Sequence, residues 1–166
     1  MKIKLLYFLI IAVPVFLIDH ITKLFASKYL DFFTIKEIIP GFFNFILVHN
    51  KGAAFGMFAN RTTITSTIIF YSLTIIAIVI LIELLIKTPT NKKLYMISYN
   101  MILGGALGNL YDRIFQGFVV DFLDFYHKSY HWATFNVADA VVVIGTGLLI
   151  TAIFIYDEDN NEGVKS

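Results

Sequence analysis

Apolar residues dominate four long stretches of the chain, which short polar stretches separate. The apolar stretches cover about residues 3–25, 64–86, 94–110 and 137–156. A helix needs about 20 predominantly apolar residues to cross the hydrocarbon core of a bilayer. The pattern therefore predicts an all-α membrane protein with four transmembrane helices, in a single integral membrane domain over residues 1–166. The polar tail after residue 156 is expected to fray.

The pattern changes between the first and second apolar stretches. Residues 34–48 are rich in β-branched and aromatic side chains, and Pro40 and Gly41 interrupt them. This composition predicts two short strands around a turn. We expect residues 26–61 to form a small β-rich lobe outside the membrane, where aromatic side chains partition well at the bilayer surface.

Four spans would place both termini on the same side of the membrane. The connection at residues 87–93 holds three lysines and no acid, and the chain begins with Lys2 and Lys4. Basic residues favour the cytoplasmic side. We therefore expect cytoplasmic termini, and an outer face that gathers the unusual polar residues Asp19, Asn50, Asn109, Arg113, Asp121, Asn136 and Asp139.

Composition and charge narrow the possible partners. Hydrophobic residues make up 58% of the chain and charged residues only 15%, which agrees with a membrane protein. The net charge of +1 and the scattered lysines give no reason to expect nucleic acid as a partner. Without cysteine, the chain has no disulfide, thiol nucleophile or thiolate metal site. His127 and His131 have a spacing compatible with two metal ligands, but no third ligand pattern accompanies them, so we expect no metal or other cofactor.

Asp121 and Asp139 lie at or beside the ends of apolar stretches, each with hydrophobic neighbours and a nearby asparagine. An ionisable group at such depth is costly and indicates a functional site. Two acids held together in a poorly hydrated place cannot easily both ionise. One member of such a pair can deprotonate a water while the other polarises a scissile carbonyl. The sequence therefore predicts an aspartyl dyad for peptide hydrolysis.

Two other pairs of residues favour structural roles. Asp19 and Lys23 are four residues apart, so they share a helix face and can neutralise each other. Gly104 and Gly108 form a GxxxG pair, which lets a neighbouring helix approach closely. Asp112 and Arg113 are expected in a polar turn that follows the third span.

Two alternatives to a peptidase stay open from the residues. In a small proton-coupled transporter, Asp19, Asp121 and Asp139 would form a proton relay. The chain has no internal repeat, and its acids gather toward one surface, which disfavours this alternative. In a non-enzymatic assembly factor with a structural acid pair, replacing Asp121 or Asp139 would alter stability more than activity.

Five motifs follow one another from the first span to the fourth, and together they resemble the bacterial lipoprotein signal peptidases, or type II signal peptidases. The motifs are Asp19-His20-Ile21-Thr22-Lys23, Asn50-Lys51-Gly52-Ala53-Ala54-Phe55-Gly56, Gly105-Ala106-Leu107-Gly108-Asn109-Leu110-Tyr111-Asp112-Arg113, Val119-Val120-Asp121-Phe122 and Phe135-Asn136-Val137-Ala138-Asp139. The chain departs from the family's usual pattern in having His20 in place of glutamine and His49 in place of arginine.

The resemblance implies an aspartyl endopeptidase of the bacterial inner membrane. It would remove the signal peptide from diacylglyceryl-modified prolipoproteins by cutting before the lipidated cysteine, and globomycin-type cyclic peptides would inhibit it. By position, Asp121 and Asp139 are the implied catalytic pair. The residues implied to orient the pair or bind substrate are Asn50, Gly52, Asn109, Arg113 and Asn136, and those implied to support the structure are Asp19, Lys23 and Asp112.

Overall fold

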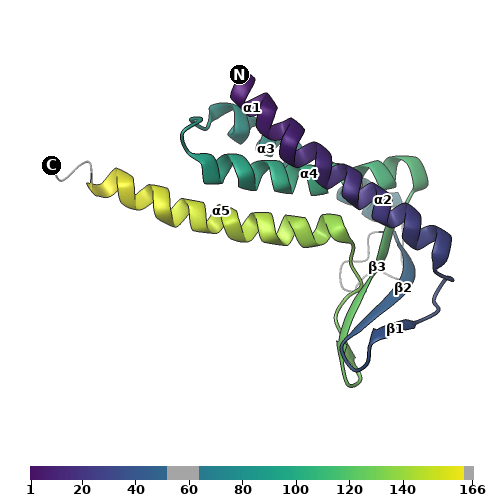
Figure 1. Ribbon diagram of the computed structural model, residues 1–166. Coiled ribbons are helices and arrows are strands. Elements are labelled where there is room, and N and C mark those ends of the chain that lie inside the picture. The colour runs from purple at the N-terminus through teal and green to yellow at the C-terminus, as the bar shows by residue number, and fades with distance from the viewer. Residues whose placement is uncertain (52–63, 163–166) are drawn as a thin grey trace.

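A computed structural model describes residues 1–51 and 64–162 of the chain (Figure 1). The helical segments are α1 (Lys2–Tyr7), η1 (Phe8–Ala12), α2 (Val13–Tyr29), α3 (Ile64–Lys87), α4 (Lys93–Gln116) and α5 (Val137–Glu162). The strands are β1 (Lys36–Ile39), β2 (Phe43–Asn50), β3 (Val119–His127) and β4 (Tyr130–His131). The fold is therefore mostly helical with a small antiparallel sheet.

The first helix runs without a break through α1, η1 and α2, because η1 is a short π-helical segment between two α-helical ones. Pro14 lies two residues after the end of this segment. Since proline has no N–H, it cannot pair with the carbonyl group four residues earlier, and a wider turn accommodates this loss. Among the described residues, Lys2–Tyr29 and Val137–Tyr156 are long and apolar enough to cross a membrane.

The other helices extend beyond the predicted spans. Helix α4 continues to Gln116, so the polar turn predicted at Asp112 and Arg113 was wrong, and both residues belong to the last turns of the helix. Gly117 ends α4 in the left-handed conformation that favours glycine, with φ of 78°. Helix α5 continues to Glu162, into the tail that was expected to fray.

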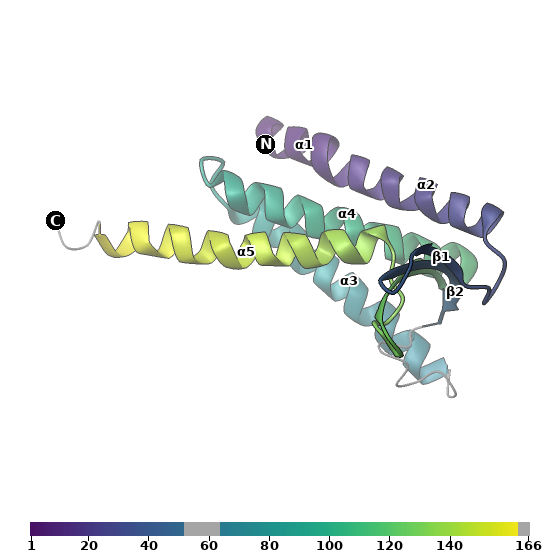
Figure 2. The ribbon, with the colours of Figure 1, turned by 60° about the horizontal axis from the view of Figure 1, so that its bottom comes forward.

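The helices lie side by side, and the sheet lies at one end of them (Figures 1 and 2). At this end α2 and α4 finish and α5 begins. The N-terminus, the end of α5 and the connection between α3 and α4 lie at the opposite end. Helix α4 packs against α2, α3 and α5. The arrangement therefore brings the end of α4 and the start of α5 next to the sheet.

Glycines on α4 allow the closest helix contacts, as the GxxxG pair predicted. A Cβ atom at Gly104 would lie 2.7 Å from the carbonyl oxygen of Ala12, and one at Gly108 would lie 2.5 Å from Oδ2 of Asp19. On another side of α4, a Cβ atom at Gly105 would lie 2.7 Å from the carbonyl oxygen of Ala138. Helix α4 thus closely approaches the backbone of the first helix at Gly104 and that of α5 at Gly105.

We expect Gly105→Ala to lower both stability and activity, because its methyl group would push the backbone of α5 away from α4 just before Asp139. Overpacking of this kind typically costs about 1–3 kcal/mol. The matched control is Gly147→Ala on α5, since a Cβ atom there meets nothing within 4 Å. Thermal unfolding in detergent would measure the difference, and equal melting temperatures for the two variants would contradict the prediction.

The four strands form one antiparallel sheet in the order β1-β2-β3-β4. Its first hairpin confirms the two strands predicted around Pro40 and Gly41, and Gly41 has a φ of 76°. The predicted lobe boundaries were wrong, because residues 26–29 belong to α2 and half of the strands come from residues 119–131. The sheet itself agrees with the small β-rich lobe predicted beside the helices.

A polar contact inside the lobe joins β2, β3 and β4. The buried carboxylate of Asp124 accepts a hydrogen bond from Asn44 Nδ2 at 2.9 Å and lies 2.9 Å from Nδ1 of His131. The ring of Tyr126 stacks on that of His131. Within residues 1–51 and 64–162, no group of three His, Cys, Asp or Glu side chains could hold a metal ion. His131 pairs with the carboxylate of Asp124.

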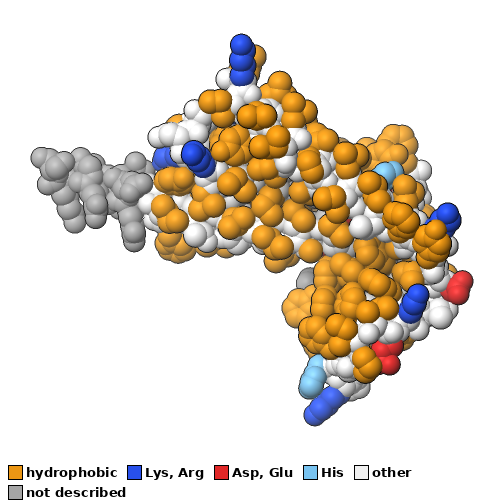
Figure 3. Space-filling model, viewed as in Figure 1, with side chains coloured by type: hydrophobic (Ala, Val, Ile, Leu, Met, Phe, Trp, Pro, Cys, Tyr) orange, Lys and Arg blue, Asp and Glu red, His pale blue; other side chains and the backbone are white. Residues whose placement is uncertain are grey.

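Apolar side chains cover most of the helical surface that Figure 3 displays, whereas charged side chains gather on the lobe and near the opposite end. On α3, for example, Ile76 and Val79 are more than half exposed, and on α5 Val143 is 71% exposed. A contiguous apolar surface of this extent indicates contact with lipid or with another apolar partner.

Candidate active site

Asp139 lies in the first turn of α5, where it forms a reciprocal cap with Asn136. The N–H group of Asp139 donates to Asn136 Oδ1 at 3.0 Å, and the N–H group of Asn136 donates to Asp139 Oδ2 at 3.2 Å. This is the geometry of a capping box. It holds the Asp139 carboxylate at the helix N-terminus, where the helix dipole favours negative charge.

Asp121 lies on β3, next to the end of β2. Its side chain is buried and accepts two amide hydrogen bonds, from Asn50 Nδ2 to Oδ2 at 2.9 Å and from Asn136 Nδ2 to Oδ1 at 2.8 Å. Asn136 therefore contacts both aspartates. The structure thus brings together the two acids that the sequence singled out, although one comes from a strand and the other from a helix.

Burial first and the neighbouring negative charge of Asp139 second raise the pKa of Asp121 to about 7. The hydrogen bonds from Asn50 and Asn136 oppose this shift because they stabilise the ionised form. Two interacting acids titrate as a pair. Asp121 can therefore hold a proton near neutral pH, as acid–base catalysis by a dyad requires of one of its members.

Asn109 on α4 connects the pair to a buried cation. Its Nδ2 donates to Asp139 Oδ1 at 2.7 Å, while its Oδ1 accepts hydrogen bonds from Lys23 Nζ at 2.9 Å and Asn136 Nδ2 at 3.2 Å. Both oxygens of Asp139 thus accept a hydrogen bond, one from Asn109 and one from the backbone of Asn136.

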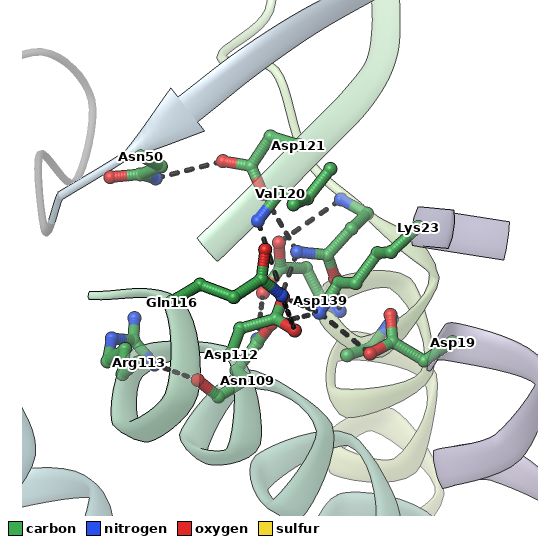
Figure 4. A network of polar contacts seen from close by, with 12 residues as sticks. Asp19, Lys23, Asn50, Asn109, Asp112, Arg113, Gln116, Val120, Asp121 and Asp139 are labelled. Carbon is green, nitrogen blue, oxygen red and sulfur yellow. Dashed lines mark hydrogen bonds and ion pairs between the residues drawn. The ribbon is translucent and has the colours of Figure 1, made fainter. Parts of the chain in front are cut away.

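The ion pair predicted between Asp19 and Lys23 is present and has a third member (Figure 4). The ammonium group of Lys23 lies 2.7 Å from Asp19 Oδ2 and 2.9 Å from Asp112 Oδ2, and all three side chains are almost fully buried. Asp19 also accepts the N–H of Ala138 at 2.9 Å, and Asp112 accepts the N–H of Val120 at 3.3 Å. These contacts join α2, α4, α5 and β3 beside the acid pair.

Arg113 lies one helical turn from Asn109, and its guanidinium donates to the backbone carbonyl of Asn109 at 3.2 Å. The hydroxyl group of Tyr71 on α3 donates to the backbone carbonyl of Arg113. The positive charge of Arg113 interacts with both Asp121 and Asp139. Gly52, the remaining predicted site residue, lies outside the described residues.

The two histidines that depart from the pattern of the resembled family, His20 and His49, contact aromatic rings. His49 on β2 pairs with Val120, so its side chain points to the face of the sheet opposite Asp121, where its ring stacks on Phe118. Burial and the charge of Lys51 lower the pKa of His49. His20 contacts the rings of Phe16 and Tyr111 between α2 and α4.

Fold and site together define a helical membrane protein with a buried pair of aspartates at the junction of its helices and its sheet. Comparison with known proteins identifies the family. Residues 11–155 match the family model described as signal peptidase (SPase) II. The chain belongs to the signal peptidase II family, a family of aspartic peptidases, which confirms the predicted resemblance and the predicted enzyme class.

Curated relatives and solved structures agree with this assignment. Lipoprotein signal peptidases from Francisella tularensis subsp. novicida and Sulfurihydrogenibium sp. are each 46% identical to the chain over 90% of its length, covering 91% and 92% of those proteins. One from Alteromonas mediterranea is 37% identical over 95% of this chain and 85% of that protein. A solved bacterial membrane enzyme superposes with a TM-score of 0.78 at 33% identity, over 92% of this chain and 90% of the other. The transporter and assembly-factor alternatives are therefore not favoured.

Proposed function

We propose that this peptidase removes the signal peptide from diacylglyceryl-modified prolipoproteins by cutting before the lipidated cysteine, and that Asp121 and Asp139 are its catalytic pair. The observation that carries the proposal is the shared environment of the two carboxylates. Both accept hydrogen bonds from Asn136, and the charge of Asp139 contributes to the raised pKa of Asp121. Membership of the signal peptidase II family supports the same assignment.

A pair that shares one proton can hydrolyse a peptide bond without a metal. The ionised carboxylate takes a proton from a water molecule as the water oxygen attacks the scissile carbonyl carbon. Meanwhile the protonated carboxylic acid donates a hydrogen bond to the carbonyl oxygen. The tetrahedral intermediate then collapses as the C–N bond breaks. The leaving nitrogen takes a proton from the pair, so the products are a free carboxyl group and a free amine.

The asparagines of the site orient this pair. Asn50 donates to Asp121, Asn109 donates to Asp139, and Asn136 donates to both. We assign Arg113 to substrate binding, because its positive charge lies near both acids. Gly52 has the same assignment from its motif position. Asp19, Lys23 and Asp112 support the start of α5 and of β3 from behind the pair.

Four spans would place this site at the outer face of the bacterial inner membrane, with both termini in the cytoplasm. The positions of the N-terminus and of the end of α5 opposite the sheet, and the lysines between α3 and α4, support this orientation. A lipidated signal peptide could then reach the site sideways from surrounding lipid. The site would have to compensate peptide groups freed by local unwinding, because each unpaired group in hydrocarbon costs several kcal/mol. Globomycin-type cyclic peptides would compete for the same place.

Incubation of the purified protein in detergent with a diacylglyceryl-modified prolipoprotein tests the proposal. Mass spectrometry of the products should locate the cut directly before the lipidated cysteine. The matched control is the same precursor without the diacylglyceryl group, which should be cut much more slowly. Cleavage elsewhere, or no cleavage of the lipidated precursor by folded protein, would contradict the proposed function.

A further inference from the structure

Lys23 is a buried cation that is linked to the dyad carboxylates through amide side chains, to Asp139 through Asn109 and to Asp121 through Asn109 and Asn136. Its ammonium group has three N–H donors. Asp19 Oδ2 and Asp112 Oδ2 form ion pairs with Nζ at 2.7 and 2.9 Å, and Asn109 Oδ1 accepts a hydrogen bond from it at 2.9 Å. Two carboxylates would suffice to balance one positive charge. The third contact, to a neutral amide, is therefore not needed for charge balance; it provides an acceptor for the ammonium and at the same time constrains the amide.

The contact with Lys23 decides which way the amide of Asn109 points. An asparagine amide has nearly the same shape in its two flipped orientations, but one end accepts and the other donates hydrogen bonds. In the observed orientation the oxygen faces Lys23 and the nitrogen donates to Asp139 Oδ1. A flip would place the NH₂ group against an ammonium and the oxygen against a carboxylate, replacing two attractive contacts by two repulsive ones.

The same polarity continues into Asn136. Its Nδ2 donates to both Asn109 Oδ1 and Asp121 Oδ1, and its Oδ1 accepts the N–H of Asp139. The oxygen of Asn109 therefore provides an acceptor that keeps the NH₂ group of Asn136 on the side of Asp121. A chain of hydrogen bonds thus links Lys23 to both acids, to Asp139 through the amide of Asn109 and to Asp121 through the amides of Asn109 and Asn136.

We propose that Lys23 is a positioning residue for the peptidase reaction, because its ammonium fixes the amide orientation of Asn109 and, through it, that of Asn136, so that both amides present N–H groups to the acid pair. The proposal rests on the proposed function of this pair. It differs from simple charge balance within the ion triad of Asp19, Lys23 and Asp112. A charge-balancing lysine would affect folding, whereas an orienting lysine acts on the chemical step.

The test needs a variant that removes the donor without leaving uncompensated buried charge, because breaking one partner of a buried ion pair is strongly destabilising. Combining Lys23→Met with Asp19→Asn and Asp112→Asn removes all three charges. Asparagine oxygens can still accept the backbone N–H groups that Asp19 and Asp112 bind. In a matched variant, Lys23→Gln replaces Lys23→Met, so that a neutral N–H donor of similar length remains.

We expect the methionine variant to lose about 10- to 100-fold in kcat with KM nearly unchanged, in the range found when an outer partner of a functional side chain is removed. The glutamine variant should recover most of this loss. Since Lys23 acts through Asn109, the methionine variant that also carries Asn109→Ala should have a kcat only slightly below that of the Asn109→Ala single variant.

Cleavage rates of the lipidated precursor, measured on variants with matched melting temperatures, decide between the two roles. An unchanged kcat in the methionine variant would overturn the inference. It would also be overturned if the substitutions of the methionine variant lowered kcat by the same factor in the Asn109→Ala protein as in the wild type. If the methionine variant does not fold, a folded glutamine variant with kcat reduced as strongly as by Asn109→Ala would overturn it as well. Failure of the wild type to cut would instead refute the proposed function.

Discussion

Replacing either Asp121 or Asp139 by asparagine is expected to abolish cleavage of a lipidated precursor while leaving the protein folded. Asparagine has nearly the same shape as aspartate, but it can neither take a proton from water nor hold the proton that the pair shares. Positioned general acids and bases contribute roughly 10²–10⁴-fold to a rate, so each variant should lose at least this much in kcat. The double variant should lose little more, because the two residues act as a unit.

Asp124→Asn is the matched control for this experiment. Asp124 is a third buried aspartate, on the same strand as Asp121, but it contacts Asn44 and His131 inside the lobe. We expect Asp124→Asn to keep most of its activity. Rates should be compared on protein with an intact melting transition. Normal turnover in Asp121→Asn or Asp139→Asn would exclude the dyad, and equal loss in all three variants would indicate a structural effect.

Much of the helical framework could be predicted from the chain alone, since long apolar stretches leave few alternatives to membrane-length helices. The same holds for the ion pair of Asp19 and Lys23, whose spacing already places both side chains on one helix face. The close approach at Gly104 and Gly108 followed from local spacing in the same way. Each of these features depends on residues that are neighbours along one helix.

The features that were missed depend on contacts between distant segments. Residues 119–131 supply half of the strands, but β3 pairs with β2 about 75 residues earlier, so no local pattern revealed its partner. The sharing of Lys23 between Asp19 and Asp112 likewise joins two helices. One local signal was available and was overlooked, because Asn136 followed three residues later by Asp139, at the start of an apolar run, is the pattern of a capping box.

The pKa of Asp121 also predicts how the stability of the protein depends on pH. In the unfolded chain this carboxyl group has a pKa near 3.8, whereas burial first and the charge of Asp139 second raise it to about 7 in the folded protein. Between these values the folded state binds more protons than the unfolded state. Stability from this group is therefore fully present below about pH 4 and is lost as the pH rises toward 7.

Asp121→Asn should remove this contribution, so its stability relative to wild type should increase from pH 4 to pH 8 by an amount on the order of a few kcal/mol, at about 1.4 kcal/mol for each pKa unit. Thermal unfolding in detergent across this range would measure it. In Asp139→Asn the loss of stability from pH 4 to pH 8 should be smaller than in wild type but still present. Burial of Asp121, the larger cause of its raised pKa, remains in this variant. Parallel curves for wild type and Asp121→Asn would contradict the raised pKa.

The same titration should appear in catalysis, where the wild-type rate should fall above about pH 7 as the pair loses its shared proton.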